Sequence, residues 1–351
     1  MTVGGRRTEY SMKSWLKTES VLPAYLAGGL LLILSVLAGL SLGATGLGLS
    51  EIWQALRAGD LNAPALRILR YARLPRVWGG VICGAALSVS GAVIQGTLHN
   101  RLASPSIIGV NAGAGLAVTI ASALGILGGW RLSLIAFLGA FAVVMPISLG
   151  AKRWGATGGT VILLGVAVNS LLGAVSDTVI TLSPDVGVMT AHFKAGDLSG
   201  ATEAVLIPAT VIILSAILLL MTLANTLEVL SLGDDTARSL GVRTGLARGI
   251  LLLLAALLAG AAVSVCGLLS FVGLLIPHGV RRGLGRFGAY RAGHHIPLCA
   301  LFGGGFVTLC DTLSRVMFAP FEVPVGILLA FVGAPFFVFI LIRGRGGDHH
   351  A

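Results

Sequence analysis

Ten apolar runs, each about 18 to 25 residues long, constrain the fold of this chain more than any other feature. At roughly 1.5 Å of rise per residue, a helix of that length crosses a hydrocarbon core of about 30 Å. Transmembrane β-strands would instead alternate apolar and polar residues over about 10 positions, a pattern that is absent here. The sequence therefore predicts an all-α, polytopic membrane protein with about ten transmembrane helices. The expected spans are residues 23–42, 77–98, 105–124, 131–150, 158–181, 203–225, 248–265, 267–284, 295–313 and 325–342.

The composition supports a membrane protein and argues against other classes. Of the 351 residues, 56% are hydrophobic and only 11% are charged, whereas charged residues make up about a quarter of soluble domains. The net charge of +10 is spread over short loops without a basic stripe interleaved with aromatic residues, so we expect lipid around the chain and no nucleic-acid partner. The four cysteines fall in apolar runs without a CxxC spacing, and we interpret them as packing residues rather than metal ligands.

The distribution of basic residues predicts an orientation. Short loops rich in Lys and Arg stay in the cytoplasm, and an even number of spans puts both chain ends on the same side. With the amino terminus inside, 16 of the 24 Lys and Arg are cytoplasmic. We therefore expect a cytoplasmic tail at 1–22, a membrane domain at 23–343 and a second cytoplasmic tail at 344–351. The first apolar run is too long for the core of a signal peptide, so we expect it to remain as a span.

Four arginines break this pattern just before the second span. The span count places Arg67, Arg70, Arg73 and Arg76 at the outer face, where basic residues are normally depleted. An exception of this size indicates a partner outside the membrane. The alternative, for Arg73 and Arg76, is that they are anchors whose charged ends reach the lipid headgroups.

A polar segment at 230–247 interrupts the apolar pattern on the cytoplasmic side. Asp234 and Asp235 are typical of a helix start, where carboxylates meet the positive end of the helix dipole. Asp234 and Arg238 lie four residues apart and are expected to pair on one helical face, and Gly241 is a natural terminator.

The apolar side of this short helix would consist of Leu232, Ala237 and Leu240. Such a helix outside the bilayer either docks another protein or merely connects two spans. The sequence contains no GxxxxGK[ST] loop to hold nucleotide phosphates, and the glycines of GVNAGAG at 109–115 lack the accompanying lysine. If ATP drives this protein, another chain must therefore bind it.

Small residues and prolines indicate how the helices pack. Lipid gives no hydrophobic reward for helix association, so the 50 glycines predict helices that approach backbone to backbone. Prolines within or beside the spans predict kinked or broken helices, which are tolerated where protein or water takes up the freed carbonyl groups. These prolines are Pro105, Pro146, Pro208, Pro277 and Pro335.

Seven segments in a fixed order carry a family resemblance over residues 66 to 343. They are RLPR at 73–76, GAALSVSGAVIQG at 84–96, NRLASPSIIGVNAGAGLA at 100–117, LSLGDDTARSLGV at 230–242, GLLSFVGLLIPHGVRR at 267–282, DTLSR at 311–315 and EVPVGILLAFVGAPFF at 322–337. Together they resemble the FecCD family, the permeases of bacterial ABC importers for iron-siderophore complexes, haem and cobalamin.

The resemblance implies ten helices per subunit and an ATP-driven importer in the bacterial inner membrane. It would move a ferric chelate from the periplasm to the cytoplasm, with siderophore complexes ahead of haem and then cobalamin. The implied partners are a second permease subunit, which we expect to be a copy of this chain, two ATP-binding cassette ATPases and a periplasmic substrate-binding protein. The chain itself would not be an enzyme and would bind no cofactor, since ATP and Mg²⁺ belong to the ATPases.

The resemblance also assigns residues to three sites. The positions implied for docking of the binding protein are Arg73, Arg76 and Arg315. For Arg315 the alternative is an ion pair with Asp311, one helical turn away, and the two interpretations can coexist. The positions implied for coupling to the ATPase are Gly233, Asp234, Asp235, Ala237, Leu240 and Gly241. Asn100 and Leu102 match a cytoplasmic gate, where this chain has Arg101 in place of a common proline and Ser104 in place of a common acidic residue.

No metal site is expected. We interpret His278 as a packing residue, and His294 and His295, which we expect in an inner loop, lack the spacing of metal ligands.

Two other classes remain as alternatives. An ion-coupled secondary transporter would need carboxylates within the spans, and Asp177 is the only candidate well inside them. An intramembrane enzyme would need a catalytic motif, yet no HExxH, GxSxG or pair of catalytic aspartates occurs within the spans. The identity of the chelate stays open, because in the family it is selected largely by the binding protein.

Overall fold

The computed structural model describes residues 21–43, 51, 54, 57, 63–153, 158–286 and 291–344. Within those ranges the chain forms helices and connecting turns, with no strand. Most of the two expected tails, residues 1–20 and 345–351, lies outside the described residues.

Ten long helices coincide with the ten expected spans. They are α1 (Leu22–Ser41), α4 (Leu74–Thr97), α5 (Val110–Ala123), α6 (Gly129–Arg153), α7 (Gly158–Leu182), α9 (Glu203–Thr222), α12 (Thr244–Cys266), α13 (Val272–Arg286), α14 (Ala292–Val316) and α15 (Val325–Gly344). By length and composition, seven stretches of the described chain are long and apolar enough to cross a membrane, while α5 is a shorter apolar helix. The all-helical membrane fold predicted from the sequence is confirmed.

Five short elements complete the described chain. They are α3 (Pro64–Ile68), the π-helical turn η1 (Leu69–Arg73), α8 (Pro184–Ala195), α10 (Ala224–Leu230) and α11 (Asp234–Ser239). Together α3, η1 and α4 form one continuous helical stretch, Pro64–Thr97.

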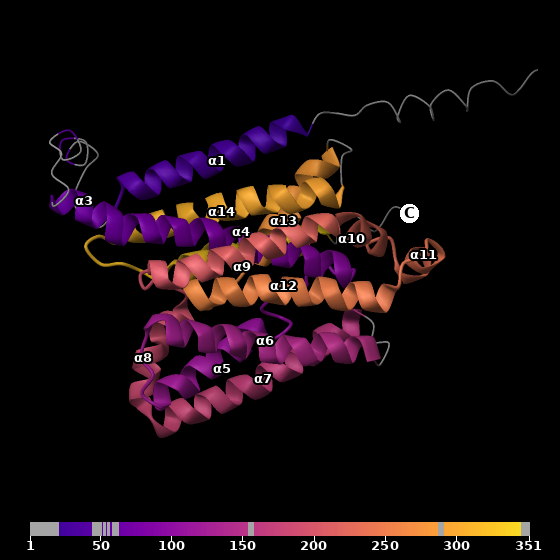
Figure 1. Ribbon diagram of the computed structural model, residues 1–351, viewed down its shortest axis with the longest axis horizontal. Coiled ribbons are helices and arrows are strands. Elements are labelled where there is room, and N and C mark those ends of the chain that lie inside the picture. Colours follow the sequence, from indigo (N-terminus) through magenta and orange to yellow (C-terminus); the bar gives the residue numbers. More distant parts are fainter. Residues whose placement is uncertain are drawn as a thin grey trace, which may run out of the picture.

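The long helices run roughly side by side and carry the short elements at opposite ends. Figure 1 shows α3 and α8 at one end of the bundle and α10 and α11 at the other. Helix α4 is central, packing against α12, α13 and α14, and almost its entire length is buried. Helices α5, α6 and α7 form a second group, which joins the first through the packing of α6 against α12.

Glycines let α4 touch its neighbours backbone to backbone, as the sequence predicts. A Cβ atom on Gly84 would lie 2.2 Å from the carbonyl oxygen of Gly303 in α14. On Gly91 it would lie 1.9 Å from the carbonyl oxygen of Gly273 in α13. No side chain fits at either crossing, so these glycines set the distance between the helices.

The carbonyl group freed by Pro277 is taken up by a side chain of α4. Proline has no N–H, so the carbonyl of Gly273, four residues earlier, loses its helical partner. The side-chain amide of Gln95 donates to that oxygen at 3.2 Å. The buried polar residue near the end of α4 is thereby explained, because it compensates for a proline in α13.

Two predicted span starts are wrong by five residues. Helix α5 begins at Val110 rather than 105, because Gly109 adopts a left-handed conformation (φ +100°) directly before it. Helix α13 begins at Val272 rather than 267, because Gly267 (φ +68°) and Phe271 (φ +66°) are left-handed. The chain reverses direction at these residues, although the hydropathy is continuous through them.

The histidine pair expected in an inner loop is helical. His294 and His295 lie in the first turn of α14. The side chain of His295 is buried and hydrogen-bonded to the carbonyl oxygen of Pro277 at 3.1 Å, so it fastens α14 to α13.

Replacement of Gly91 with alanine should destabilise the protein by about 1–3 kcal/mol, because the new methyl group forces α4 away from α13. The measurement is the thermal denaturation midpoint of the purified protein in detergent. Gly29→Ala in α1 is the matched control, since nothing lies within 4 Å of a Cβ at that position. Equal midpoints for the two variants would contradict the role assigned to the α4–α13 crossing.

Candidate functional site

A buried arginine binds three carboxylates at the end of the bundle that carries α3. The Nε atom of Arg76 donates to Asp311 at 3.0 Å, and Nη1 donates to Glu322 at 2.5 Å. Its Nη2 atom lies 3.7 Å from Asp197. Asp311 belongs to α14, Glu322 lies in the segment before α15, and Asp197 lies in the segment after α8. One guanidinium group thus joins three parts of the chain to α4.

Asp311 is shared between two arginines. One carboxylate oxygen accepts from Arg76, and the other accepts from the Nε atom of Arg315 at 3.1 Å. Only 1% of Asp311 is exposed. The Asp311–Arg315 pair expected from the one-turn spacing is confirmed, and the second arginine of the pair is supplied by α4.

Arg73 and Arg315 cover the carboxyl end of α1. The Nη1 atom of Arg73 donates to the carbonyl oxygens of Leu40 and Ser41 at 2.8 and 3.1 Å. Arg315 reaches the carbonyl of Gly39 at 3.5 Å. The last carbonyls of a helix have no intrahelical partner and carry partial negative charge, so two guanidinium groups satisfy them.

The exposure expected for the docking arginines is not observed. Arg73 is 2% exposed, Arg76 8% and Arg315 3%. Arg76 and Arg315 form ion pairs with Asp197, Asp311 and Glu322, while Arg73 donates to carbonyl groups of α1, so all three arginines have partners within the chain. Burial is tolerated because ionised groups that leave water need opposite charges and hydrogen bonds in close geometry.

The surroundings of Asp197 keep this acid ionised. Burial raises its pKa, but hydrogen bonds from Ser199 and the positive charge of Arg76 outweigh that effect and hold the pKa below its usual value. A carboxyl group with a lowered pKa stabilises the fold at every pH above its ordinary value of 3.8. That contribution is lost only as the pH falls through the lowered pKa.

Two backbone hydrogen bonds tie the end of α8 to other helices. The amide of Gly326, in the first turn of α15, donates to the carbonyl of Gly196 at 3.0 Å. The amide of Leu268, between α12 and α13, donates to the carbonyl of Phe193 at 2.9 Å. A Cβ on Gly326 would lie 2.0 Å from the carbonyl oxygen of Ala195, so glycine is required for this approach.

A cavity of about 320 Å³ lies between α5, α7 and α8 and has a partly polar lining. Its charged members are Lys194 and Asp177. The Nζ atom of Lys194 donates to Ser176 at 3.0 Å, and Ser176 also bonds Thr119 at 3.0 Å. Small and polar side chains of this kind suit a passage that holds its cargo weakly.

The segment between α4 and α5 carries the expected gate residues. The side chain of Asn100 accepts a hydrogen bond from the amide of Leu102 at 2.8 Å and so closes a tight turn, with the side chain of Arg101 exposed. His99, which has a left-handed backbone (φ +51°), bonds the carbonyl of Leu230 at the end of α10. The amide group of Asn169 in α7 donates to the carbonyls of Ser106 and Ile107 at 2.9 and 3.0 Å. The segment is therefore held from both α10 and α7.

The predicted coupling helix is α11, at the end of the bundle opposite α3 (Figure 1). Asp234 and Asp235 occupy its first turn, as expected. Gly233 (φ +111°) precedes it and Gly241 (φ +82°) ends it, both in conformations that favour glycine. The amide of Val242 closes the end of the helix by donating to the carbonyl of Ala237 at 3.0 Å.

Two details of α11 differ from expectation. Asp234 pairs with Arg248 of α12 at 2.6 Å, not with Arg238, because α12 folds back beside the start of α11. The three apolar residues do not share one covered side, since Ala237 is fully buried while Leu232 and Leu240 are exposed. The side chains of these two leucines, one before and one after α11, form an exposed apolar surface.

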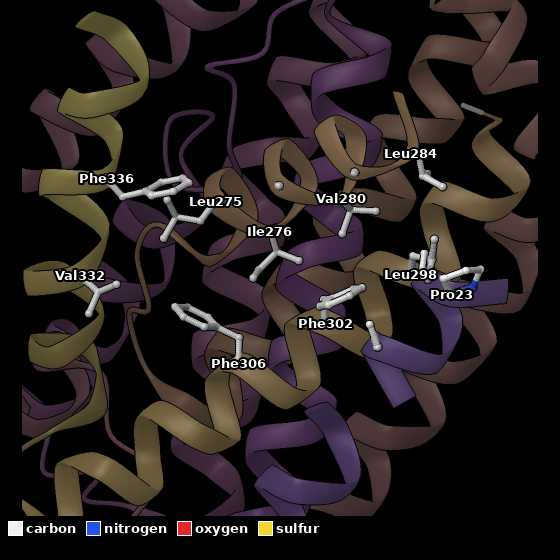
Figure 2. Close-up of a pocket in the computed structure, with 14 residues that line it drawn as sticks. Pro23, Leu275, Ile276, Val280, Leu284, Leu298, Phe302, Phe306, Val332 and Phe336 are labelled. Carbon is white, nitrogen blue, oxygen red and sulfur yellow. The ribbon is translucent and has the colours of Figure 1, made fainter. Parts of the chain in front are cut away.

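A second cavity, of about 600 Å³, is lined by apolar side chains and lies between α1, α13, α14 and α15. Figure 2 shows Phe336 beside Leu275, and Phe306 and Phe302 on either side of Ile276. No side chain of its lining can form a hydrogen bond with a polar chelate. The polar cavity beside α8 is the better candidate for the passage.

Several site residues were not identified from the sequence. Asp197 and Glu322 complete the Arg76 cluster, and His99, Asn169 and Arg248 hold the segments at the other sites. Glu322 lies within one of the seven family segments, which was the available signal for it. These contacts could not be predicted because the partners lie far apart in the sequence or on different helices.

A bundle of ten helices, with seven stretches long and apolar enough to cross a membrane and a partly polar cavity between α5, α7 and α8, defines a multi-pass membrane transport protein. The chain belongs to the FecCD transport family, whose model matches residues 31–343. It is 34% identical to the hemin transport system permease protein of Yersinia pestis over 336 residues, which cover 93% of this chain and 97% of that protein. It is 36% identical to an iron(3+)-hydroxamate import system permease protein of Bacillus subtilis over 340 residues, with coverages of 94% and 86%.

A solved structure agrees with this assignment. An inward-facing conformation of a metal-chelate type ABC transporter superimposes with a TM-score of 0.78 at 26% identity. The match covers 92% of this chain and all of the other. Family membership confirms the resemblance carried by the seven segments and identifies the chain as a transport permease rather than an enzyme.

Proposed function

We propose that this chain forms the membrane passage of an ABC importer that carries ferric chelates inward, siderophore complexes ahead of haem and then cobalamin. The observation that carries the proposal is the similarity to hemin and iron-hydroxamate permeases over nearly the full length of the chain. The alternative of an ion-coupled transporter is not favoured, because the relatives are permeases of ABC systems.

The energy for transport comes from separate ATPases that bind ATP and Mg²⁺. Support comes from the absence of a phosphate-binding loop in the sequence and from the exposed leucines flanking α11. Two copies of the chain and two ATPases make up the assembly, and Gly233, Asp234, Asp235, Ala237, Leu240 and Gly241 form the coupling segment. The hydrogen bond between His99 and α10 connects this region to the gate residues Asn100 and Leu102.

The end carrying α11 faces the cytoplasm of a bacterial cell, and the end carrying α3 faces the periplasm. Described arginines at the α11 end include Arg101, Arg238, Arg243 and Arg248, as the positive-inside rule requires. At the α3 end, Arg73, Arg76 and Arg315 are buried in ion pairs and helix caps rather than free in a loop. Their role in docking a periplasmic binding protein is to fix the shape of that surface.

The test is ATP-dependent uptake of radiolabelled iron by proteoliposomes that contain the permease with the ATPase and binding protein encoded beside it. Iron is offered as a ferric trihydroxamate, as haem and as free ferric citrate, with labelled cobalamin in parallel. Uptake that needs both ATP and the binding protein is expected for at least one chelate. Uptake driven by a proton or sodium gradient without ATP would refute the proposal.

A further inference from the structure

The apolar cavity between α1, α13, α14 and α15 is a groove about as long as one leaflet of a bilayer is thick. It runs from Leu275 to Leu284 along α13 and from Leu298 to Phe306 along α14, which at 1.5 Å per residue is about 12–14 Å. Figure 2 shows these side chains in two rows, with Pro23 of α1 at one end. A hydrocarbon core is roughly 30 Å thick, so the groove matches half of it.

The end of the groove near Pro23 lies at the headgroup level, on the same side as α10 and α11. The amide of Ala292, at the start of α14, donates to the carboxylate of Glu228 in α10 at 3.2 Å. The hydroxyl of Tyr25, in the first turn of α1, bonds Nδ1 of His294 at 3.2 Å. Tyrosine is enriched where hydrocarbon meets headgroups, because its ring is apolar and its hydroxyl polar. This pair therefore marks the edge of the hydrocarbon.

Two glycines keep the groove open. Gly279 and Gly283 lie one helical turn apart on its α13 side, and nothing lies within 4 Å of a Cβ atom at either position. Gly91, in contrast, lets two backbones touch. The space above Gly279 and Gly283 is lined by apolar side chains, which give water no hydrogen-bonding partners, so an apolar ligand is favoured there.

Two exposed cations lie at the headgroup end of the groove. Arg282 directly precedes Gly283, and Arg291 directly precedes α14, three residues before His294. In the part of the chain that the structure describes, neither arginine forms an ion pair. Guanidinium groups match the oxygens of a phosphate, and basic pockets between transmembrane helices bind anionic headgroups on the cytoplasmic side, where the α11 end is proposed to lie. The charge of this end is complementary to an anionic lipid.

We propose that the groove binds one acyl chain of an anionic membrane phospholipid, whose phosphate lies at Arg282 and Arg291. The chain fills the space over Gly279 and Gly283 and so packs between α13 and α15. The lipid is a structural ligand of the membrane domain, and its binding does not depend on which cargo is carried.

The test counts the phospholipids that stay bound to the full-length permease complex, by native mass spectrometry after extraction in mild detergent. Phosphatidylglycerol and phosphatidylethanolamine are titrated as separate probes. The wild type should retain one phosphatidylglycerol per permease chain and prefer it at least about fivefold over phosphatidylethanolamine. Gly279→Leu combined with Gly283→Leu fills the groove and should lower this occupancy at least about tenfold, because the acyl chain loses its space.

The arginines are tested separately through the headgroup preference. Arg282→Gln combined with Arg291→Gln should still bind lipid in the groove, but the preference for phosphatidylglycerol should fall below about twofold. Lysine at both positions should restore the preference, since the charge is kept. These variants also decide the assignment if the variant with the filled groove does not fold.

Gly29→Leu combined with Gly249→Leu is the matched control, because these glycines of α1 and α12 also have nothing within 4 Å of a Cβ but do not line the groove. It should retain lipid like the wild type. Wild-type occupancy in the filled variant would overturn the inference, as would equal retention of both lipids by the wild type. Loss of a second permease copy from the filled complex would also overturn it and would assign the groove to a contact between copies.

Discussion

Replacing Asp311 with alanine should destabilise the permease by about 3–5 kcal/mol, the largest loss of stability expected for any single substitution described above. The substitution leaves Arg76 and Arg315 buried without the carboxylate they share. Removal of one member of a buried charge cluster is costly because the remaining charge has neither its partner nor water. The thermal midpoint in detergent should fall by roughly 6–10 °C, at about 2 °C per kcal/mol for a protein of this size.

Two further variants test the cause of that loss. Asp235→Ala removes an exposed acid at the start of α11 and should cost less than about 1 kcal/mol. Adding Arg315→Met to Asp311→Ala should recover part of the lost stability, because one unpaired charge is then removed. A midpoint for Asp311→Ala equal to that of wild type would show that the cluster does not hold this end of the fold together.

Loss of the two exposed leucines beside α11 should abolish transport. Leu232→Asp combined with Leu240→Asp places charges on the surface proposed for the ATPase. A central apolar contact contributes about 2 kcal/mol or more, so ATPase binding should weaken at least 30-fold. The measurements are the affinity of the purified ATPase for the permease in nanodiscs and the rate of ATP-dependent chelate uptake.

Leu124→Asp is the control for this experiment, because Leu124 is also highly exposed but follows α5 at the other end of the bundle. It should bind the ATPase like the wild type. The thermal midpoint of the double variant should be unchanged, since neither leucine is buried. Normal ATPase affinity with both aspartates present would disprove the docking role of α11.

The ten spans were predictable because membrane crossing imposes a length and a hydropathy on each helix. The failures occur where a left-handed residue reverses the chain inside an apolar run, as at Gly109 and Gly267. Hydropathy averages over such residues and cannot locate them. The close packing of glycines was also predictable as a class, but the pairing of Gly91 with Gly273 depends on which helices become neighbours.

The charged clusters were the least predictable part. Basic residues were counted along the chain as if each lay in a loop, whereas Arg76 meets Asp197, Asp311 and Glu322 from more than 100 residues away. The local pair between Asp311 and Arg315 was found because it spans one helical turn. The predicted pair between Asp234 and Arg238 was wrong, since Asp234 pairs with Arg248 of the next helix, α12.

The hydrogen bonds around Gly196 limit how the bundle can open at the end that carries α8. Because α8 is fastened to the first turn of α15 and to the segment that precedes α13, it cannot tilt alone without breaking main-chain hydrogen bonds. A motion that moves α8 and the first turn of α15 together as one rigid unit keeps these hydrogen bonds and therefore costs less free energy. Arg76 forms ion pairs with both Asp197, which follows α8, and Glu322, which precedes α15, and so restrains this motion relative to α4.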